Sequence, residues 1–155
     1  RKTTHGFLFF EKYAIEIGGG DTHRLSLSDT ILLKENHLSI LPDIVRIIPD
    51  IKQRVSFTKK IEVEVTSIEM ATKAAQVGVD IVMLDNFKPS QIKEVVMRLS
   101  EMGIRDNISL EASGGITPEN IIEYASAGVD VLSMGYLTHS AKGLDFSLIF
   151  EDYTE

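Results

Sequence analysis

Short runs of aliphatic residues alternate along the chain with longer segments of helical periodicity. The runs at residues 30–34, 60–65, 80–85, 108–111 and 130–133 are short and rich in aliphatic side chains, which predicts buried strands. Between most of them, apolar residues recur three and four positions apart, which predicts helices with one apolar face. Because strands and helices alternate, the sequence predicts a parallel sheet whose right-handed crossovers contain the helices.

Local signals place the ends of the helices. Thr66 and the glutamate three residues later form a capping-box pair, and Gly78 ends the helix that they open. Thr117 is expected as an N-cap, with Pro118 in the first turn. A kink is expected at Pro49, because proline lacks a backbone N–H donor. The predicted helices cover residues 6–17, 44–55, 66–78, 89–102 and 117–128.

An internal repeat supports a barrel built from like units. Residues 75–81 and 125–131 share an alanine, the tripeptide Gly-Val-Asp and a following β-branched residue, each where a helix ends and a strand begins. The predicted strands are fewer than a closed TIM barrel contains. We therefore expect an incomplete parallel α/β (TIM-like) barrel, formed as a single domain over residues 1–155. Since the chain opens on Arg1 rather than methionine, we expect it to belong to a longer gene product or to have been cut upstream.

Composition narrows the class of function. The 155 residues include 43% hydrophobic and 25% charged side chains, an ordinary globular mixture. A net charge of -7 argues against non-specific binding of nucleic acid or of an anionic membrane, both of which favour a basic face. The absence of cysteine excludes disulfides and thiolate chemistry, and fits a cytoplasmic protein. No apolar run has the ~20 residues of a membrane span, and no signal-peptide pattern opens the chain.

The strand at residues 60–65 carries charge where a buried parallel strand should be apolar. Because side chains alternate along a strand, its three aliphatic residues share one face, and Glu62 and Glu64 share the other. Parallel strands usually bury both faces in apolar contacts. Buried carboxylates need a partner, so the glutamate face either lines a polar cavity or belongs to a solvated edge strand or a structural ion pair.

Charged residues also gather at the predicted carboxyl ends of the strands, where α/β barrels carry their sites. The residues at these ends are Lys34, Glu64, Asp85, Glu111 and Gly135. Four ionisable groups at successive strand ends exceed what stability alone needs. These ends are therefore the candidate site.

Two glycine turns follow the last two predicted strands. Ser113, Gly114 and Gly115 lead into the predicted helix start, and Gly135 follows the next strand. Free backbone amides and the positive end of a helix dipole form a cradle for phosphate, so we expect phosphate binding here. The alternative is two tight turns that need glycine only for their conformation. His139, just beyond Gly135, is a further candidate.

A cluster of basic residues lies in the first quarter of the chain. Arginine suits bidentate recognition of carboxylates, and lysine binds phosphate as a point charge. In a protein of net charge -7, this clustering indicates a pocket for an anionic substrate, with ordinary surface charge as the alternative. The residues are Arg1, Lys2, His23, Arg24 and Lys34.

A series of motifs occurs in the order found in one known family. They include Arg1-Lys-Thr-Thr4, His23-Arg24, Glu62-Val-Glu-Val65, Met83-Leu-Asp-Asn-Phe87 and Leu110-Glu-Ala-Ser-Gly-Gly-Ile116. Over essentially its whole length, the chain closely resembles the quinolinate phosphoribosyltransferases, and in particular the C-terminal domain of that family, an incomplete, seven-stranded α/β barrel. The N-terminal sandwich domain of the family and the opening segments of the barrel are expected to be absent.

The resemblance implies a pentosyltransferase reaction of NAD biosynthesis. Quinolinate and phosphoribosyl pyrophosphate, with Mg²⁺ as cofactor, would give nicotinate mononucleotide, pyrophosphate and CO₂. It also implies a homodimer or a higher homo-oligomer, in which the N-terminal domain completes the site across the interface. By matching position, Arg1, His23 and Arg24 would bind the quinolinate carboxylates, and Lys2 and Lys34 would contact the phosphoribosyl donor.

The resemblance assigns the chemistry to three residues. Lys34, Glu64 and Asp85 would be catalytic, and the two carboxylates would hold the ribose hydroxyls and the magnesium ion. Departure of pyrophosphate leaves positive charge on the ribose ring, which flanking carboxylates stabilise. The 5-phosphate would lie on the two glycine turns, at Ser113, Gly114, Gly115 and Gly135, with His139 as the further candidate beside them.

At three positions the sequence departs from the pattern of the family. His5 stands where the family usually has proline, and Leu8 where it usually has a basic residue. These changes affect the turn that carries Arg1 and Lys2. Tyr136 replaces a small residue and could narrow the phosphate pocket.

Three other interpretations are compatible with the sequence. The first is a molybdate-operon homologue of the same family with another substrate. The second is an aldolase that forms a Schiff base at Lys34. The third is a catalytically incomplete barrel fragment that only mediates assembly.

Overall fold

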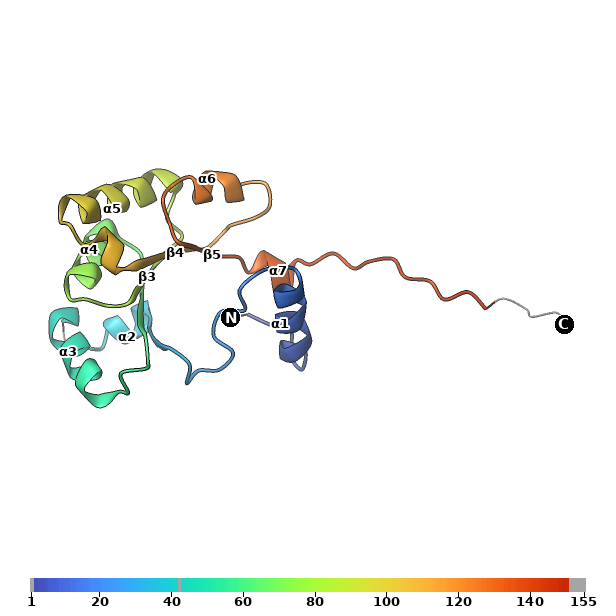
Figure 1. The fold of residues 1–155 in the computed structure, drawn as a ribbon, viewed down its shortest axis with the longest axis horizontal. Coiled ribbons are helices and arrows are strands. Elements are labelled where there is room, and N and C mark those ends of the chain that lie inside the picture. Colours follow the sequence, from blue (N-terminus) through green and yellow to red (C-terminus); the bar gives the residue numbers. More distant parts are fainter. Residues whose placement is uncertain (1, 42, 151–155) are drawn as a thin grey trace.

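The computed structural model describes residues 2–41 and 43–150, and its strands form one five-stranded sheet (Figure 1). All neighbouring strands are parallel, and their order in the sheet follows the sequence. Each predicted strand is present, which confirms the parallel α/β architecture. The strands are β1 Ile31–Leu33, β2 Ile61–Val65, β3 Ile81–Asp85, β4 Ser109–Ser113 and β5 Val131–Ser133.

Helices occupy the connections between strands, as the alternating pattern predicts. The 3-10 turn η1 (Arg105–Asn107) and the short helices α2 (Glu35–Leu38) and α7 (Tyr136–His139) have no signal in the apolar periodicity. Pro49 lies inside α3 (Ile44–Arg54), which continues through it. The helices are α1 Leu8–Ile17, α2 Glu35–Leu38, α3 Ile44–Arg54, α4 Ile68–Gln76, α5 Pro89–Glu101, α6 Ile121–Ala125 and α7 Tyr136–His139.

The N-cap of α4 differs from the predicted one. Ser67, not Thr66, precedes the helix in an extended conformation, and its Oγ accepts the N–H of Met70 at 3.2 Å. With the cap at Ser67, Glu69 is the second helical residue, one position too early for the reciprocal bond of a capping box. Two adjacent hydroxyl residues can each act as an N-cap, and sequence spacing does not choose between them.

Helix α6 begins later than predicted. Oδ1 of Asn120 accepts the N–H of Thr117 at 2.8 Å, and Nδ2 of the same side chain donates to the Gly115 carbonyl at 3.0 Å. These bonds hold residues 117–120 as a turn, so Asn120 is the N-cap and the helix starts at Ile121. The prediction of a helix opened by Thr117 and Pro118 is therefore wrong.

The register of the strands gives the sheet one apolar face. Paired residues of parallel strands point to the same side, so Val63, Val82 and Leu110 share a face, and all three are fully buried. Burying an aliphatic side chain of this size contributes about 1.5–3 kcal/mol. Apolar residues of α3, α4 and α5 complete this core, among them Ile48, Ala71, Ala74, Ile92, Val95 and Leu99.

The opposite face of the sheet is polar. The register places Glu64 beside Met83, and Met83 beside Glu111. Further along the strands, Asp85 lies beside Ser113, and Ser113 beside Ser133. Because β2 lies between β1 and β3, the interpretation of its glutamates as part of a solvated edge strand is wrong.

The repeated Gly-Val-Asp tripeptide joins neighbouring strands at their amino ends. In the first copy, the Asp80 carboxylate accepts the N–H of Ile61 at 2.7 Å, while the Asp80 N–H donates to the Ile61 carbonyl at 3.0 Å. In the second copy, Asp130 makes the same two bonds with Leu110, at 2.7 and 2.9 Å. Each aspartate therefore ties the start of its own strand to the strand before it.

Arg105 reinforces the second of these connections. Its guanidinium donates to both carboxylate oxygens of Asp130 at 2.9 Å, and to the carbonyls of Ile108 at 3.0 Å and Gly128 at 2.9 Å. Burial acts to raise the pKa of Asp130, but the bonds from Arg105 and from the Leu110 amide outweigh it and hold that pKa below its usual value of 3.8.

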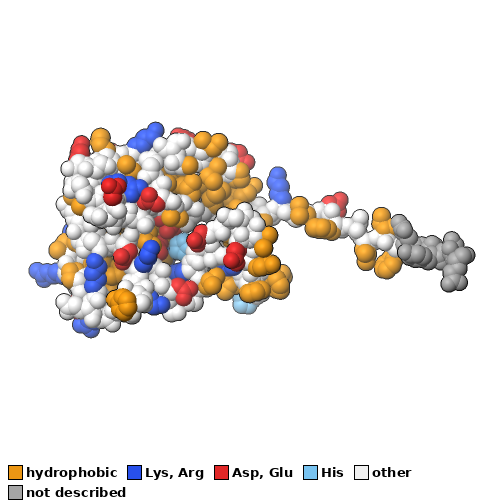
Figure 2. Space-filling view, in the orientation of Figure 1, with side chains coloured by type: hydrophobic (Ala, Val, Ile, Leu, Met, Phe, Trp, Pro, Cys, Tyr) orange, Lys and Arg blue, Asp and Glu red, His pale blue; other side chains and the backbone are white. Residues whose placement is uncertain are grey.

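The two ends of the described chain are largely exposed. Residues 141–150 have no regular structure and run away from the body of the molecule (Figure 1). The apolar side chains of α1 gather on the surface, where Phe9 is 75% and Ile17 70% exposed (Figure 2). Of the helices in the described part of the chain, none combines the length and the apolarity needed to cross a membrane.

We predict that Asp130→Ala lowers the free energy of unfolding by about 1–2 kcal/mol, because it leaves the Arg105 guanidinium and the Leu110 amide without their acceptor. Because the folded-state pKa of Asp130 is lowered, its stabilisation is complete above pH 3.8 and disappears as the pH falls through the lowered value. Urea unfolding at several pH values measures both effects.

The matched control is Asp50→Ala, which removes an exposed aspartate that pairs with Arg54 at 3.0 Å within α3. Exposed pairs of this spacing contribute only about 0.3–0.5 kcal/mol. Equal losses in the two variants would contradict the structural role of Asp130.

Candidate active site

Charged side chains collect at the carboxyl ends of β1, β2 and β3, where the strand-end pattern predicts the site. Lys34 follows β1, and its Nζ lies 3.4 Å from Oε2 of Glu64 on β2. The Glu64 side chain is 14% exposed and that of Lys34 43%, so the pair faces solvent mainly through the lysine. Asp85 ends β3 and accepts a hydrogen bond from Nδ2 of Asn86 at 2.9 Å.

Asn86 also joins the ends of β3 and β4. Its backbone N–H donates to the Ser113 carbonyl at 2.7 Å, and its φ of 57° lies in the left-handed region, which asparagine tolerates better than most residues. Gly114, with a φ of 99°, passes so close that a Cβ there would lie 2.3 Å from Oδ1 of Asn86. Position 114 therefore requires glycine. This close approach packs the predicted turn against Asn86, the residue that follows Asp85.

The glycine turns themselves differ in their surroundings. Gly115 has a φ of 64° and open space where a Cβ would stand. Gly135 lies beside the His139 ring, since a Cβ on Gly135 would be 2.7 Å from Nε2. Because α6 starts only at Ile121, the turn at 113–115 does not run into a helix N-terminus. The predicted helix start directly after this turn is therefore wrong, and the turn offers backbone amides without a helix dipole. Gly135, by contrast, is the N-cap of the four-residue helix α7.

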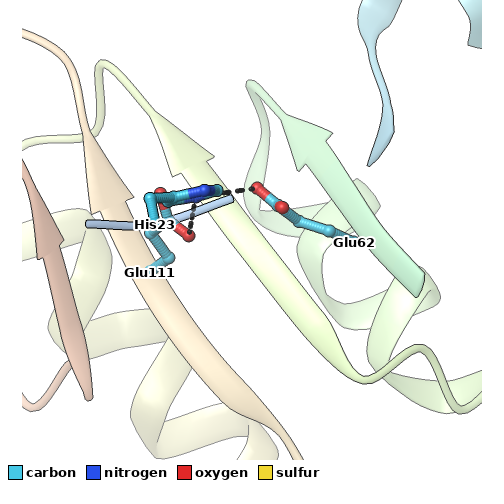
Figure 3. Close-up of side chains that lie close together, drawn as sticks. All are labelled: His23, Glu62 and Glu111. Atoms are coloured by element: carbon cyan, nitrogen blue, oxygen red, sulfur yellow. Dashed lines mark ion pairs between the residues drawn. The ribbon is translucent and has the colours of Figure 1, made fainter. Parts of the chain in front are cut away.

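A second group of polar side chains is buried on the same face of the sheet (Figure 3). His23 reaches in from the loop between α1 and β1, and its Nε2 lies 3.4 Å from Oε2 of Glu111 and 4.0 Å from Oε1 of Glu62. Glu62 is 0% and Glu111 2% exposed. Oε1 of Glu111 also accepts a hydrogen bond from Oγ of Ser133 at 2.5 Å. We call His23, Glu62, Glu111 and Ser133 the inner cluster.

Local bonds hold the loop that carries His23. The residue has a left-handed φ of 55°, and its backbone N–H donates to Oδ1 of Asp21 at 2.7 Å. Its ring Nδ1 accepts the backbone N–H of Arg24 at 2.7 Å. Nearby, the buried Lys12 donates from Nζ to the Thr22 carbonyl. The half-buried Arg24 is thus attached to the polar face through the ring of its neighbour.

The structure brings some of the predicted site residues together and leaves others apart. Lys34 and Glu64 are in contact, and the residues 113–115 are joined to the end of β3 by Asn86. Lys2 is exposed ahead of α1, and His139 is exposed beside Gly135. Arg1 lies outside the described residues, so its predicted role is not addressed by the structure.

Four contacts of the site have no clear signal in the sequence. The alternation along β2 identifies Glu62 as anomalous, and the strand-end pattern identifies Glu111, but nothing local connects either with His23. Ser133 and Asn86 are small polar residues at strand ends, and their positions there are the only signal available.

The parallel strands, the connecting helices and the charged residues at the carboxyl ends of the strands define a domain of the α/β barrel type, with five strands present. A family model described as "Quinolinate phosphoribosyl transferase, C-terminal domain" matches residues 1–149. The chain belongs to this family, and the resemblance identified from the sequence motifs is confirmed.

Two similar proteins from archaea carry the same name. The chain is 54% identical over 148 residues to the probable nicotinate-nucleotide pyrophosphorylase (carboxylating) of Archaeoglobus fulgidus, which covers 96% of this chain and 56% of that protein. The protein of the same name from Methanothermobacter thermautotrophicus is 51% identical, over 96% of this chain and 53% of its own length. The crystal structure of NadC from Streptococcus pyogenes superposes with a TM-score of 0.85 at 41% identity, over 95% of this chain and 50% of that one. The chain thus spans about half the length of these relatives.

We predict that Gly114→Ala destabilises the protein more than Gly115→Ala does. Both positions have a left-handed φ, which costs an alanine about 1–2 kcal/mol. Only at position 114 does the added Cβ also collide with Asn86 and disrupt its bond to Ser113. Thermal unfolding of the two variants, which serve as each other's control, measures the difference. A larger loss for Gly115→Ala would contradict the close approach at Gly114.

Proposed function

We propose that this chain is the part of a quinolinate phosphoribosyltransferase that carries the reaction centre. The reaction joins the ribose of phosphoribosyl pyrophosphate to the ring nitrogen of quinolinate and releases pyrophosphate and CO₂, giving nicotinate mononucleotide. Membership of the family and the name of its relatives, nicotinate-nucleotide pyrophosphorylase, support the proposal. Because the chain spans about half the length of those relatives, we assign the activity to the full-length protein that contains it.

The observation that carries the proposal is the row formed by Lys34, Glu64 and Asp85 at the ends of three adjacent strands. Glu64 and Asp85 lie on the same face of neighbouring strands, and both are half-buried. When pyrophosphate leaves, positive charge develops on the ribose ring, and carboxylates placed beside it stabilise that charge. The two acids therefore supply the electrostatic part of the reaction.

The cations of the proposed site bind the two anionic substrates. Lys34 stands beside Glu64, so its ammonium is suited to contact a phosphate of the donor while the carboxylate faces the ribose. Arg24, with its planar guanidinium, is suited to bidentate binding of a quinolinate carboxylate. Holding the ring nitrogen in line with the ribose is a positioning effect. Arg1, Lys2, His23 and His139 are further binding residues that the family resemblance implies.

The glycine turns are the proposed site of the 5-phosphate. The left-handed turn at Gly114 and Gly115 follows β4, which lies beside the strand that ends at Asp85. Asn86 bonds both to Asp85 and to the backbone at the start of this turn. Successive backbone amides in such turns form concavities that bind anions. Gly135 and the adjacent His139 ring lie at the end of the next strand. A phosphate bound here would place the ribose toward Glu64 and Asp85.

Mg²⁺ is the cofactor that we propose. The ion prefers one or two carboxylates together with phosphate oxygens and water. Glu64 and Asp85 offer carboxylates on adjacent strands, and the donor substrate supplies the phosphates, so the residues fit this ion. When bound, Mg²⁺ would neutralise charge that accumulates on the departing pyrophosphate.

Assembly as a homodimer or a higher homo-oligomer belongs to the same proposal. The family resemblance implies that a partner chain completes the site. The exposed apolar residues of α1 are consistent with such a contact, since Phe9 and Ile17 are 75% and 70% exposed.

The contact of Lys34 with Glu64 favours this function over a Schiff-base aldolase. At 3.4 Å the two groups form an ion pair, which uses the charge of the lysine. Schiff-base chemistry requires the neutral amine.

We predict that Glu64→Gln and Asp85→Asn each lower kcat/KM of the full-length protein by about 10²-fold or more while the fold is preserved, because each removes a charge that stabilises the transition state. Since both act on the same ribose, the double variant should be less impaired than the product of the single effects. The measurement is steady-state kinetics with quinolinate and phosphoribosyl pyrophosphate both varied. Wild-type turnover in either single variant would contradict the assigned role.

Arg24→Ala should behave differently from the carboxylate variants. It removes a clamp on a substrate carboxylate, so KM for quinolinate should rise about tenfold or more, while KM for the donor changes little. Arg54→Ala, which removes an exposed arginine of α3, is the matched control and should leave both constants unchanged. An unchanged quinolinate KM in Arg24→Ala would exclude Arg24 from the binding site.

A further inference from the structure

The inner cluster contains two carboxylates to which the proposed function gives no role. Glu62 and Glu111 are almost completely buried, and His23 reaches both of them. Removing carboxylates from water is unfavourable, and aliphatic side chains at these positions would stabilise the sheet at least as well. Stability alone therefore does not explain why carboxylates occupy these positions.

The hydrogen bond at Nδ1 shows where the proton of the His23 ring lies. Nδ1 accepts the backbone N–H of Arg24 at 2.7 Å, so this nitrogen carries a lone pair rather than a proton. The proton of the ring is therefore on Nε2, the nitrogen that faces Glu111 at 3.4 Å and Glu62 at 4.0 Å. Both ring nitrogens face protein groups, one in the loop and the other on the sheet. His23 is therefore placed to act on quinolinate through Arg24, rather than by the direct contact that the family resemblance implies.

This tautomer decides between two uses of the inner cluster. His23, Glu62 and Glu111 have ligand atoms within 4.8 Å of one another, as a bound cation would require. A histidine that binds a metal through Nε2 normally has its proton on Nδ1 and donates it to an acceptor. Here Nδ1 faces a donor instead, so Nε2 offers a proton and no lone pair. The arrangement fits a fixed histidine and does not fit a metal centre.

The fixed histidine is held from both sides. On the sheet side, Glu111 is oriented by the 2.5 Å bond from Ser133 of β5. On the loop side, His23 holds the backbone of Arg24, although its own φ of 55° is unfavourable for a residue with a side chain. An unfavourable conformation of this kind persists only when surrounding contacts enforce it.

We propose that Glu111, oriented by Ser133, is a positioning residue that fixes Arg24 over the polar face by way of the His23 ring. Glu62 adds negative charge beside the same Nε2–H. This proposal rests on the proposed function, in which Arg24 binds a carboxylate of quinolinate. It deepens that function, because Glu111 of β4 and Ser133 of β5 then contribute to the affinity for quinolinate without contacting it.

The test uses the full-length protein and separates binding from turnover. Glu111→Gln keeps the size of the side chain and removes its charge, and should raise KM for quinolinate about tenfold while kcat and KM for the donor stay within twofold. Ser133→Ala should raise the same KM about threefold. Ser126→Ala, which removes a hydroxyl that donates to the Ile122 carbonyl in α6, is its control and should change nothing.

A double-mutant cycle tests whether Glu111 acts through the histidine. His23→Asn keeps an acceptor near the Arg24 amide and tolerates a left-handed φ, but lacks the atom that faces Glu111. It should raise quinolinate KM as Glu111→Gln does, and the double variant should be no worse than either single variant. Effects that multiply, or a KM in Glu111→Gln within twofold of wild type, would overturn the proposal. Circular dichroism checks that each variant is folded.

The tautomer provides a measurement that does not depend on activity. In ¹⁵N NMR, His23 of the folded protein should show Nε2 protonated and Nδ1 unprotonated, and Glu111→Gln should average the two tautomers. Added Zn²⁺ should leave these signals unchanged. A protonated Nδ1, or a metal-bound spectrum, would overturn the proposal. If wild type does not turn over quinolinate and phosphoribosyl pyrophosphate, the proposed function fails, and the NMR result alone then decides whether Glu111 fixes His23.

Discussion

The register of β2 between β1 and β3 is the constraint on which the rest of the structure depends. Val63 enters the apolar core, while the two glutamates on either side of it face the polar side of the sheet. A slip of one residue would exchange these faces, because side chains alternate with a period of two. It would place two carboxylates under α4 and α5 and would remove both the inner cluster and the contact between Lys34 and Glu64. Core packing and the charged site therefore enforce the same register.

The polar face has a buried part and a more exposed part, which differ in their chemistry. In the inner cluster the two glutamates are almost completely buried, and Glu111 contacts both His23 and Ser133. The row of Lys34, Glu64 and Asp85 is only partly buried, and in the proposed function it faces the substrates. Electrostatic interactions strengthen as water is excluded. The two parts lie side by side on one face, since Glu64 and Glu111 are at the same level of the sheet with Met83 between them.

The sequence predicts the sheet and the strand-end residues because both depend on local pattern. Short aliphatic runs identify all five strands, and alternation along β2 identifies the polar face from Glu62 and Glu64. The N-cap of α4 is missed because Thr66 and Ser67 are chemically alike and only the backbone conformation selects one of them. The start of α6 is missed because the Asn120 side chain satisfies the turn that precedes it.

The inner cluster could not be predicted, because it forms between segments that are distant in the sequence. His23 belongs to a loop with no periodicity, and its contacts with Glu62 and Glu111 exist only after the strands have paired. The tautomer of its ring depends on a backbone amide, which no side-chain pattern encodes.

The order of the strands has a consequence for how the protein is made. Each strand pairs with the one synthesised just before it, and the Gly-Val-Asp aspartates secure two of these pairings as soon as the second strand emerges. Parallel sheets generally fold slowly, because their pairings close long loops. Here every pairing closes only the single connection that precedes it. The sheet can therefore grow on the ribosome in one direction, with each new strand adding to an edge that is already complete.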